Sequence, residues 1–90
     1  MRHMVYVERG AEKDIGRLPS EVSDKVDERI LSLGMEPRPR GCTKVAFGLY
    51  RIIAGKYRIV YSVDDGKKEV RIWIVRHRRD VYKRLRRLFR

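Results

Sequence analysis

The sequence predicts an α+β fold in which two N-terminal helices pack on one face of a mainly antiparallel β-sheet and a short basic helix ends the chain. Three observations support this prediction. Apolar residues recur at helical spacing through residues 11–33, short β-rich runs joined by tight turns fill residues 43–74, and basic residues crowd the final segment. Ninety residues suffice for one domain with a modest core, so we expect residues 1–90 to form a single domain.

The N-terminal third supplies one strand and two helices. Residues 4–8 are typical of a short strand, and the first helix follows with apolar positions at Ala11, Ile15 and Leu18. Pro19 ends that helix, and Ser20 is the expected N-cap of the next. Gly34 is the expected C-terminal cap of the second helix, whose apolar stripe consists of Val22, Val26, Ile30 and Leu33.

The turn of the first hairpin specifies its register. After a loop at residues 35–42 and a strand expected at 43–47, Gly55-Lys56 is a two-residue turn with glycine first. Ile53 then lies opposite Arg58. Because side chains alternate between faces, Arg51 and Arg58 share one face as diagonal neighbours, roughly 7–8 Å apart at the backbone. The other face carries the expected core residues Tyr50, Ile52, Ala54, Tyr57, Ile59 and Tyr61.

A second hairpin and a last helix complete the expected fold. Asp65-Gly66 predicts another two-residue turn, which would place Arg58 opposite Trp73. The face of the two arginines would then gain Arg71, Trp73 and His77, and the core face would gain Val70, Ile72 and Ile74. Asp80 is the expected cap of the last helix, whose apolar side consists of Val81, Leu85 and Leu88.

The charge distribution predicts a polyanionic partner for the C-terminal part of the chain. The formal net charge is +11. Residues 1–36 carry 6 Lys or Arg against 8 Asp or Glu, whereas residues 37–90 carry 17 against 4. No apolar run is long enough to span a membrane, and Cys42 is the only cysteine, so we expect a cytoplasmic protein with no intrachain disulfide and no metal site.

Several side chains of the basic half have both a chemical and a structural interpretation. Arg51 and Arg58 could hold a phosphate, or they could be solvent-exposed strand arginines. Trp73 could stack on a base, or it could pack against the last helix. His77 could shuttle protons near neutral pH, and Tyr82 could contact a phosphate or stack on a base, although either could also be an ordinary surface or anchoring residue.

The chain resembles the RelE/ParE toxin superfamily and, within it, the RelE-like ribosome-dependent mRNA interferases. The resemblance runs nearly end to end. It rests on Leu-Pro at residues 18–19, Pro-Arg-Pro-Arg-Gly at 37–41, Gly-Leu-Tyr-Arg-Ile at 48–52, Gly-Lys-Tyr-Arg-Ile-Val-Tyr at 55–61 and His-Arg-Arg-Asp-Val-Tyr at 77–82. These segments separate the branches of the superfamily less well, because ParE-like gyrase inhibitors share the scaffold and part of the pattern.

The resemblance implies particular roles by position. The basic residue that follows the Gly-Leu-Tyr motif is Arg51, and the arginine after the hairpin tyrosine is Arg58. A further arginine before the last helix matches Arg78, with Arg79 as the alternative alignment. These cations would stabilise charge, and Tyr82 or His77 would handle protons. Residues expected to bind RNA or the ribosome are Lys44, Lys56, Arg71, Trp73, Arg76, Arg79, Lys83, Arg84, Arg86 and Arg87.

The resemblance also implies a reaction and partners. Such toxins cut mRNA in the ribosomal A site through metal-independent attack of the ribose 2′-OH on the adjacent phosphate. A cognate antitoxin, RelB-like in this case, silences them, and no small-molecule cofactor or membrane is involved. We therefore expect a type II toxin–antitoxin toxin with ribosome, mRNA and antitoxin as partners. The alternatives are a ParE-like gyrase inhibitor and a catalytically inactive RelE-like binding module.

One position departs from the family pattern. The family often has a second basic residue two positions after the first, and here that position is Ile53. The expected register puts Ile53 directly opposite Arg58. The substitution could lower activity, shift the role to Lys44, Arg71 or His77, or mark a toxin that has lost catalysis.

Overall fold

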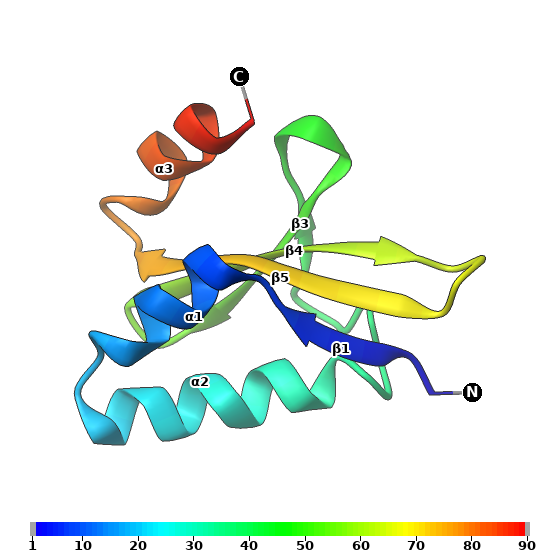
Figure 1. Cartoon of the computed structure of the whole chain (residues 1–90), viewed down its shortest axis with the longest axis horizontal. Helices are drawn as coiled ribbons and strands as arrows, with labels where there is room; N and C mark the ends of the chain where they lie inside the picture. The colour runs from blue at the N-terminus through cyan, green and yellow to red at the C-terminus, as the bar shows by residue number, and fades with distance from the viewer. Residues whose placement is uncertain (1, 90) are drawn as a thin grey trace.

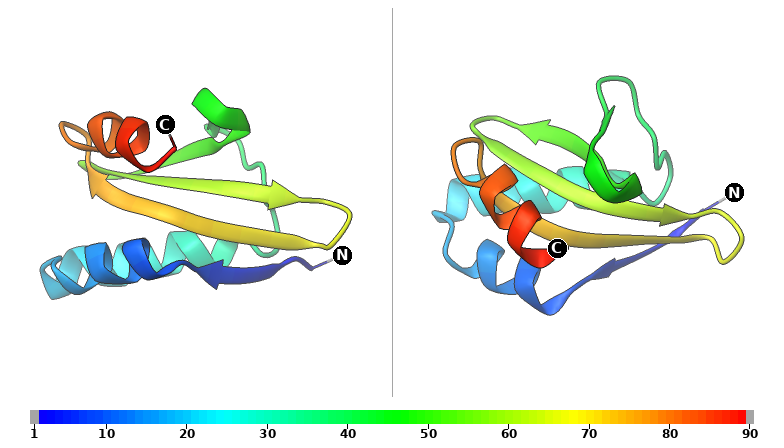
Figure 2. Two further views of the ribbon diagram at one scale, coloured as in Figure 1. Left: turned by 45° about the horizontal axis from the view of Figure 1, so that its top comes forward. Right: turned by 90° about the horizontal axis from the view of Figure 1, so that it is seen from above.

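A five-stranded sheet forms the middle layer of the fold, with two helices on one face and one helix on the other (Figures 1 and 2). The computed structural model describes residues 2–89. The strands are β1 (Met4–Val7), β2 (Thr43–Lys44), β3 (Tyr50–Ala54), β4 (Tyr57–Asp64) and β5 (Glu69–His77). Their order in the sheet is β1-β5-β4-β3-β2, with β1 parallel to β5 and all other pairs antiparallel. The predicted α+β class is confirmed.

The three helices are α1 (Arg9–Gly16), α2 (Ser20–Ser32) and α3 (Val81–Leu88). The predicted N-cap at Ser20 is wrong, because α2 already begins at Ser20 and Pro19 takes the capping position with φ −57° and ψ 147°. The Pro19 carbonyl accepts the backbone N–H groups of Val22 and Ser23. Asp80 does occupy the position before α3, although its side chain makes no capping hydrogen bond.

Gly34 lets the end of α2 approach the start of β1. Its carbonyl accepts the His3 backbone N–H at 2.8 Å. A Cβ atom built at Gly34 would lie 3.1 Å from the His3 carbonyl oxygen and 3.2 Å from Cγ2 of Val5. A larger residue would therefore push α2 away from β1.

The first hairpin has the predicted register. Ile53 pairs with Arg58, Ile52 with Ile59, and Arg51 with Val60, around a turn in which Gly55 has φ +62°. The strand expected at residues 43–47 is shorter than predicted. Only Thr43 and Lys44 pair with β3, and Ala46–Gly48 then form a single 3₁₀ turn.

The second hairpin differs from the prediction in two ways. Its turn has four residues, because Asp64 pairs with Glu69, and the Asp64 carboxylate accepts the backbone N–H of Lys67. The strands also contain a bulge: Tyr61 pairs with Ile72 while the preceding Val60 pairs with Ile74, so Trp73 has no partner in β4. A bulge adds one residue to one strand, so every side chain of β5 beyond Trp73 changes face.

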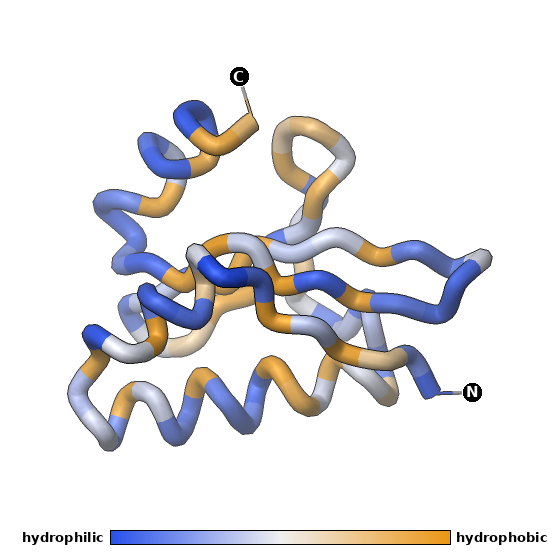
Figure 3. The backbone as a smooth tube through the Cα atoms, in the orientation of Figure 1, coloured by the Kyte–Doolittle hydropathy of each residue, from blue (hydrophilic) through white to orange (hydrophobic). Residues whose placement is uncertain are grey.

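The sheet has a buried cluster on each face. The larger one lies under α1 and α2, and α2 alternates between hydrophobic and hydrophilic segments along its length (Figure 3). This cluster consists of Ala11, Val26, Ile30, Leu33, Ile52, Ala54, Ile59, Tyr61, Val70, Ile72 and Val75. The smaller one lies under α3 and consists of Leu49, Val60, Ile74, Val81 and Leu85. Ile74, expected in the larger cluster, belongs to the smaller one because of the bulge.

Candidate active site

Arg51 lies on the α3 face of the sheet and is anchored by the neighbouring strand. Its register partner in β2 is Thr43, whose hydroxyl accepts a hydrogen bond from Nη2 of Arg51 at 2.6 Å. Nε of Arg51 is shielded from solvent and has no hydrogen-bond partner among residues 2–89. The contact with Thr43 holds one edge of the guanidinium, and its Nη atoms still carry N–H groups that can donate to an anion.

Arg58 lies on the same face and is held against its own turn. Its Nη1 donates to the carbonyl oxygens of Gly55 and Tyr57, each at 3.0 Å. The backbone N–H of Arg78 donates to the carbonyl of Lys56 at 2.8 Å, which brings Arg78 to this same turn. The predicted placement of Arg51 and Arg58 on one face is confirmed by the register, and the backbone of Arg78 is held at the turn beside Arg58.

Ile53 borders this group of cations. It pairs directly with Arg58 and is 43% exposed. By alternation it lies on the α3 face, opposite to the buried Ile52. The position that departs from the family pattern is therefore an exposed apolar side chain beside Arg58.

The bulge at Trp73 changes which residues of β5 lie on the same face as Arg58. Arg76, instead of Trp73, is the register partner of Arg58. His77 pairs with Tyr57, and the two rings meet edge to face with their centroids 5.6 Å apart. The prediction that His77 shares the face of the arginines is wrong, because its ring lies on the α1 side of the sheet, in a pocket that Asp14 and Arg17 also line.

Asp14, which no sequence pattern singled out, holds Arg76 in place. Its buried carboxylate accepts the backbone N–H of Val75 at 3.0 Å and Nε of Arg76 at 2.9 Å. The parallel pairing of β1 with β5 ends at Ile72. Beyond that point the Asp14 carboxylate accepts the Val75 N–H, which a neighbouring strand would otherwise bind. The sequence carries no signal for this role, because α1 also contains the exposed acid Glu12 and no pattern distinguishes Asp14 from it.

Helix α3 presents two different flanks to the rest of the molecule. Tyr82, Arg86 and Phe89 follow one another at spacings of four and three residues, so they share one flank. The Phe89 ring stacks on Phe47 at 5.7 Å, and this flank therefore faces the turn before β3. Tyr82 is 38% exposed there. The other flank carries Arg84, which lies beside Gly10 of α1.

Two roles were predicted for Trp73, base stacking and packing against the last helix, and the structure shows the packing contact. Its indole N–H donates to the Ser62 hydroxyl at 2.9 Å, and its ring meets Phe89 edge to face at 5.4 Å. Half-buried against the smaller cluster, Trp73 fixes the end of α3. A base could stack on it only after this contact had opened.

The other predicted RNA-binding residues fall into two groups. Arg71 is already engaged: it donates to Glu8 at 3.0 Å and Glu69 at 3.3 Å, and its guanidinium lies over the Tyr6 ring. The hydrogen bond that Arg71 donates to Glu8, and secondarily the charge of Glu69, raise the pKa of Arg71. The members of the predicted RNA-binding set that are exposed are Lys44, Lys56, Arg79, Lys83, Arg86 and Arg87. Lys44 pairs with Tyr50, so its side chain leaves the sheet on the face opposite to Arg51.

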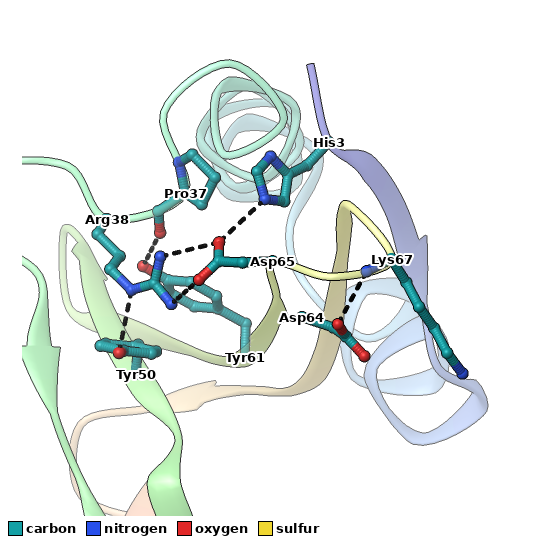
Figure 4. A network of polar contacts seen from close by, with 8 residues as sticks. All are labelled: His3, Pro37, Arg38, Tyr50, Tyr61, Asp64, Asp65 and Lys67. Carbon is teal, nitrogen blue, oxygen red and sulfur yellow. Dashed lines mark hydrogen bonds and ion pairs between the residues drawn. The ribbon is translucent and has the colours of Figure 1, made fainter. Parts of the chain in front are cut away.

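A polar network at the other end of the sheet fastens the loop before β2 (Figure 4). Arg38 donates to both carboxylate oxygens of Asp65, at 3.2 and 3.0 Å, and to the Tyr50 hydroxyl at 3.0 Å. His3 contacts the same carboxylate at 3.3 Å, and the Tyr61 hydroxyl donates to the Pro37 carbonyl at 2.7 Å. The hydrogen bonds from Arg38 and then from His3 lower the pKa of Asp65, while burial raises the pKa of Tyr61.

Residues 2–89 contain neither a candidate metal-binding group nor a membrane-spanning helix. No group of three or more His, Cys, Asp or Glu residues in this range is arranged to hold a metal ion. No helix in the same range is long and apolar enough to cross a membrane.

Comparison with known proteins identifies similar sequences and folds. The family model described as ParE toxin of the type II toxin–antitoxin system parDE matches residues 5–82. The fold is similar to the toxin–antitoxin complex RelBE2 of Mycobacterium tuberculosis, with 28% identity, TM-score 0.77, and coverage of 87% of this chain and 100% of that chain. It is also similar to the archaeal RelE–RelB complex of Pyrococcus horikoshii, with 27% identity, TM-score 0.75, and coverage of 87% and 97%.

A mutant of the E. coli toxin RelE in the free state has the same fold, with 22% identity, TM-score 0.79, and coverage of 100% of both chains. No curated protein sequence matches the chain.

Proposed function

The chain belongs to the ParE toxin family of type II toxin–antitoxin systems, within the RelE/ParE superfamily, and from this premise we propose that it is a ribosome-dependent mRNA endoribonuclease. The observation that carries the proposal is the group of anchored arginines on the α3 face. Arg51 and Arg58 share this face, and Arg78 is attached to the turn that holds Arg58. Preorganised cations of this kind suit a phosphate whose charge increases during reaction.

The proposed reaction is attack of the ribose 2′-OH oxygen on the adjacent phosphorus, with the 5′ oxygen of the next nucleotide leaving. The attacking hydroxyl loses a proton and the leaving oxygen gains one. Arg51, Arg58 and Arg78 stabilise the charge on the pentacoordinate phosphate. Arginine suits this role because it stays charged and offers several N–H donors in one plane.

Tyr82 is the residue that we propose for proton handling. Tyr82 is partly exposed on the flank of α3 that it shares with Phe89, and α3 lies on the same face of the sheet as Arg51. His77, the other sequence candidate, packs on Tyr57 on the opposite side and is not proposed for this step.

The proposed partners are the ribosome with its mRNA and a RelB-like antitoxin. Two of the similar structures are complexes of a toxin with its antitoxin. The basic α3 face is suited to nucleic acid, and an acidic antitoxin could cover the same charges.

A second candidate function is gyrase inhibition without cleavage. The matching family model carries the ParE name, and exposed Ile53 stands where RelE-like enzymes often have a cation. Both observations fit a scaffold that binds a protein target.

One experiment separates the two candidates. The chain is expressed briefly in a bacterial host, and the 5′ ends of cellular mRNA are mapped while DNA breaks are scored in the same culture. Endoribonuclease activity predicts cuts in phase with codons and intact DNA. Intact mRNA together with broken DNA would contradict the proposal and support gyrase inhibition.

A further inference from the structure

The turn between β5 and α3 uses the imidazole of His77 as a hydrogen-bond acceptor. Residues 78–80 form this turn (orange in Figure 1), which leads from the end of β5 to the helix that carries Tyr82. We propose that His77 is a positioning residue: Nδ1 of its neutral ring accepts the backbone N–H of Arg79 and thereby fixes the turn that presents Arg78 to the candidate active site. The inference rests on the proposed function, because it assigns His77 to the placement of a residue in that reaction.

Each backbone N–H of the turn has an acceptor. The N–H of Arg78 donates to the Lys56 carbonyl at 2.8 Å, and the N–H of Asp80 donates to the His77 carbonyl at 2.9 Å. The N–H of Arg79 donates to Nδ1 of His77 at 3.2 Å. The first two acceptors are backbone carbonyls, which do not titrate. The imidazole is therefore the one acceptor of this turn that can be lost by gaining a proton.

The direction of the Arg79 hydrogen bond defines the protonation state of the ring. A backbone N–H can only donate, so Nδ1 must carry a lone pair, and the proton of the neutral ring lies on Nε2. A ring that is protonated at both nitrogens has no acceptor left. Histidine is the side chain that usually changes charge between about pH 5 and 8, so the contact can be lost within that range. Asn and Asp stabilise turns in the same way, by accepting the N–H two residues on.

The ring is held in place on the α1 side of the sheet. It is half-buried and meets the Tyr57 ring edge to face, with the centroids 5.6 Å apart. The titratable and charged side chains that line the pocket around it come from α1, β4, β5 and the turn, and they are Asp14, Arg17, Tyr57, Arg76 and Asp80. Asp14 is already bound by Arg76 and the Val75 N–H. A protonated ring would therefore be attracted to Asp80, in the turn itself, and would repel the Arg79 N–H.

Loss of this contact should loosen the turn without unfolding the chain. The Lys56 carbonyl still holds the backbone of Arg78, and Val81 still packs in the smaller cluster. What changes is the backbone between these two fixed points, from which the Arg78 side chain projects. Protonation of His77 should therefore reduce the fraction of molecules in which Arg78 is correctly placed.

Two variants separate the acceptor from the ring. His77→Phe keeps an aromatic ring against Tyr57 and removes the acceptor. His77→Asn removes the ring and keeps an acceptor that can reach the N–H two residues on and does not titrate. Solvent exchange of the Arg79 amide reports the contact without any substrate. It is measured by NMR from about pH 5.5 to 8 and is corrected for the intrinsic pH dependence of amide exchange.

In the parent, the Arg79 amide should be protected about fivefold better near pH 8 than at the acidic end, the change expected for one exposed hydrogen bond. His77→Phe should show the weak protection at every pH, and His77→Asn the strong protection at every pH. Ribosome-dependent cleavage should follow the same pattern. Near pH 8, His77→Phe should cut about fivefold more slowly than the parent, and the ratio of the two rates should approach one as the pH falls.

Two results would overturn the proposal. Equal protection of the Arg79 amide in the parent and in His77→Phe near pH 8 would show that Nδ1 does not hold the turn. Protection that depends on Nδ1, together with equal cleavage rates for all three proteins, would show that the turn does not position the site. A parent that shows the pH-dependent protection but cuts no mRNA on ribosomes would support the role of His77 in the turn and contradict the proposed function.

Discussion

The two faces of the sheet differ in what they contain. The α1/α2 face holds the larger apolar cluster, under two helices whose exposed sides carry the acidic residues Glu12, Glu21, Asp24, Asp27 and Glu28. The α3 face holds a smaller cluster surrounded by cations, including Arg51, Arg58 and Arg76. Under the proposed function, the first face mainly stabilises the fold and the second face binds the RNA. Substitutions of the same chemical kind should therefore have different consequences on the two faces.

The largest expected effect is on stability, from Ile59→Ala on the α1/α2 face. Ile59 is fully buried in the larger cluster, so the truncation should lower the free energy of unfolding by about 2–5 kcal/mol. The control is Ile53→Ala, the same change on the neighbouring strand at a site that is 43% exposed. It should change stability by less than about 0.5 kcal/mol. Urea unfolding of both variants checks this, and similar losses would contradict the assignment of the two faces.

A smaller effect is expected on activity, from Ile53→Lys on the α3 face. The new cation would lie beside Arg58 and near a bound phosphate. A charge pair near water is worth about 1 kcal/mol, so cleavage should speed up roughly fivefold. Ile53→Gln, which is long but uncharged, is the control. Ribosome-dependent cleavage of a defined mRNA measures both, and an unchanged or lower rate for Ile53→Lys would contradict the idea that the site lacks one cation at this position.

The smallest expected effect concerns the pH dependence of stability at the Arg38–Asp65 network. The pKa of Asp65 is lowered by its hydrogen bonds to Arg38 and His3. A carboxyl whose pKa is lower in the folded state stabilises the fold above its unfolded pKa of about 3.9, and this stabilisation disappears as the pH falls through the folded value. Asp65→Asn should therefore be less stable than the parent near neutral pH.

Thermal unfolding of the parent and of Asp65→Asn over a range of acidic pH values tests this expectation. The difference between them should shrink as the pH falls below about 4, because the parent then loses the same contact. A difference that stays constant through this range would show that the carboxylate charge at Asp65 does not matter. Because Asp65 lies at the other end of the sheet from Arg51 and Arg58, neither outcome bears on the role proposed for the α3 face.

The sequence predicted the first hairpin correctly because its register is decided locally. A two-residue turn with Gly55 in the left-handed region leaves one alignment, and that alignment put Arg51 and Arg58 on one face. The prediction of the second hairpin was wrong because the local sequence did not specify its turn completely. The Asp-Gly pair predicted a two-residue turn, but the Asp64 side chain accepts the Lys67 N–H and supports a four-residue turn.

The bulge had no local signal at all. Trp73 leaves the ladder where its indole reaches Ser62 and its ring meets Phe89, contacts that depend on where α3 lies. That one extra residue moved His77 away from the arginines and brought Arg76 to Arg58. Asp14 was missed for a similar reason, since its partners, Val75 and Arg76, are about sixty residues away in the chain.

The most direct test of the account is the rate at which Arg58→Ala cuts a defined mRNA on ribosomes. Removing one preorganised charge stabiliser should slow cleavage about 10²–10³-fold relative to the parent, with little change in thermal stability. The control is Arg29→Ala, which removes an exposed arginine from α2 and should cut at the parental rate. If Arg58→Ala also cuts at the parental rate, the α3 face is not the active site.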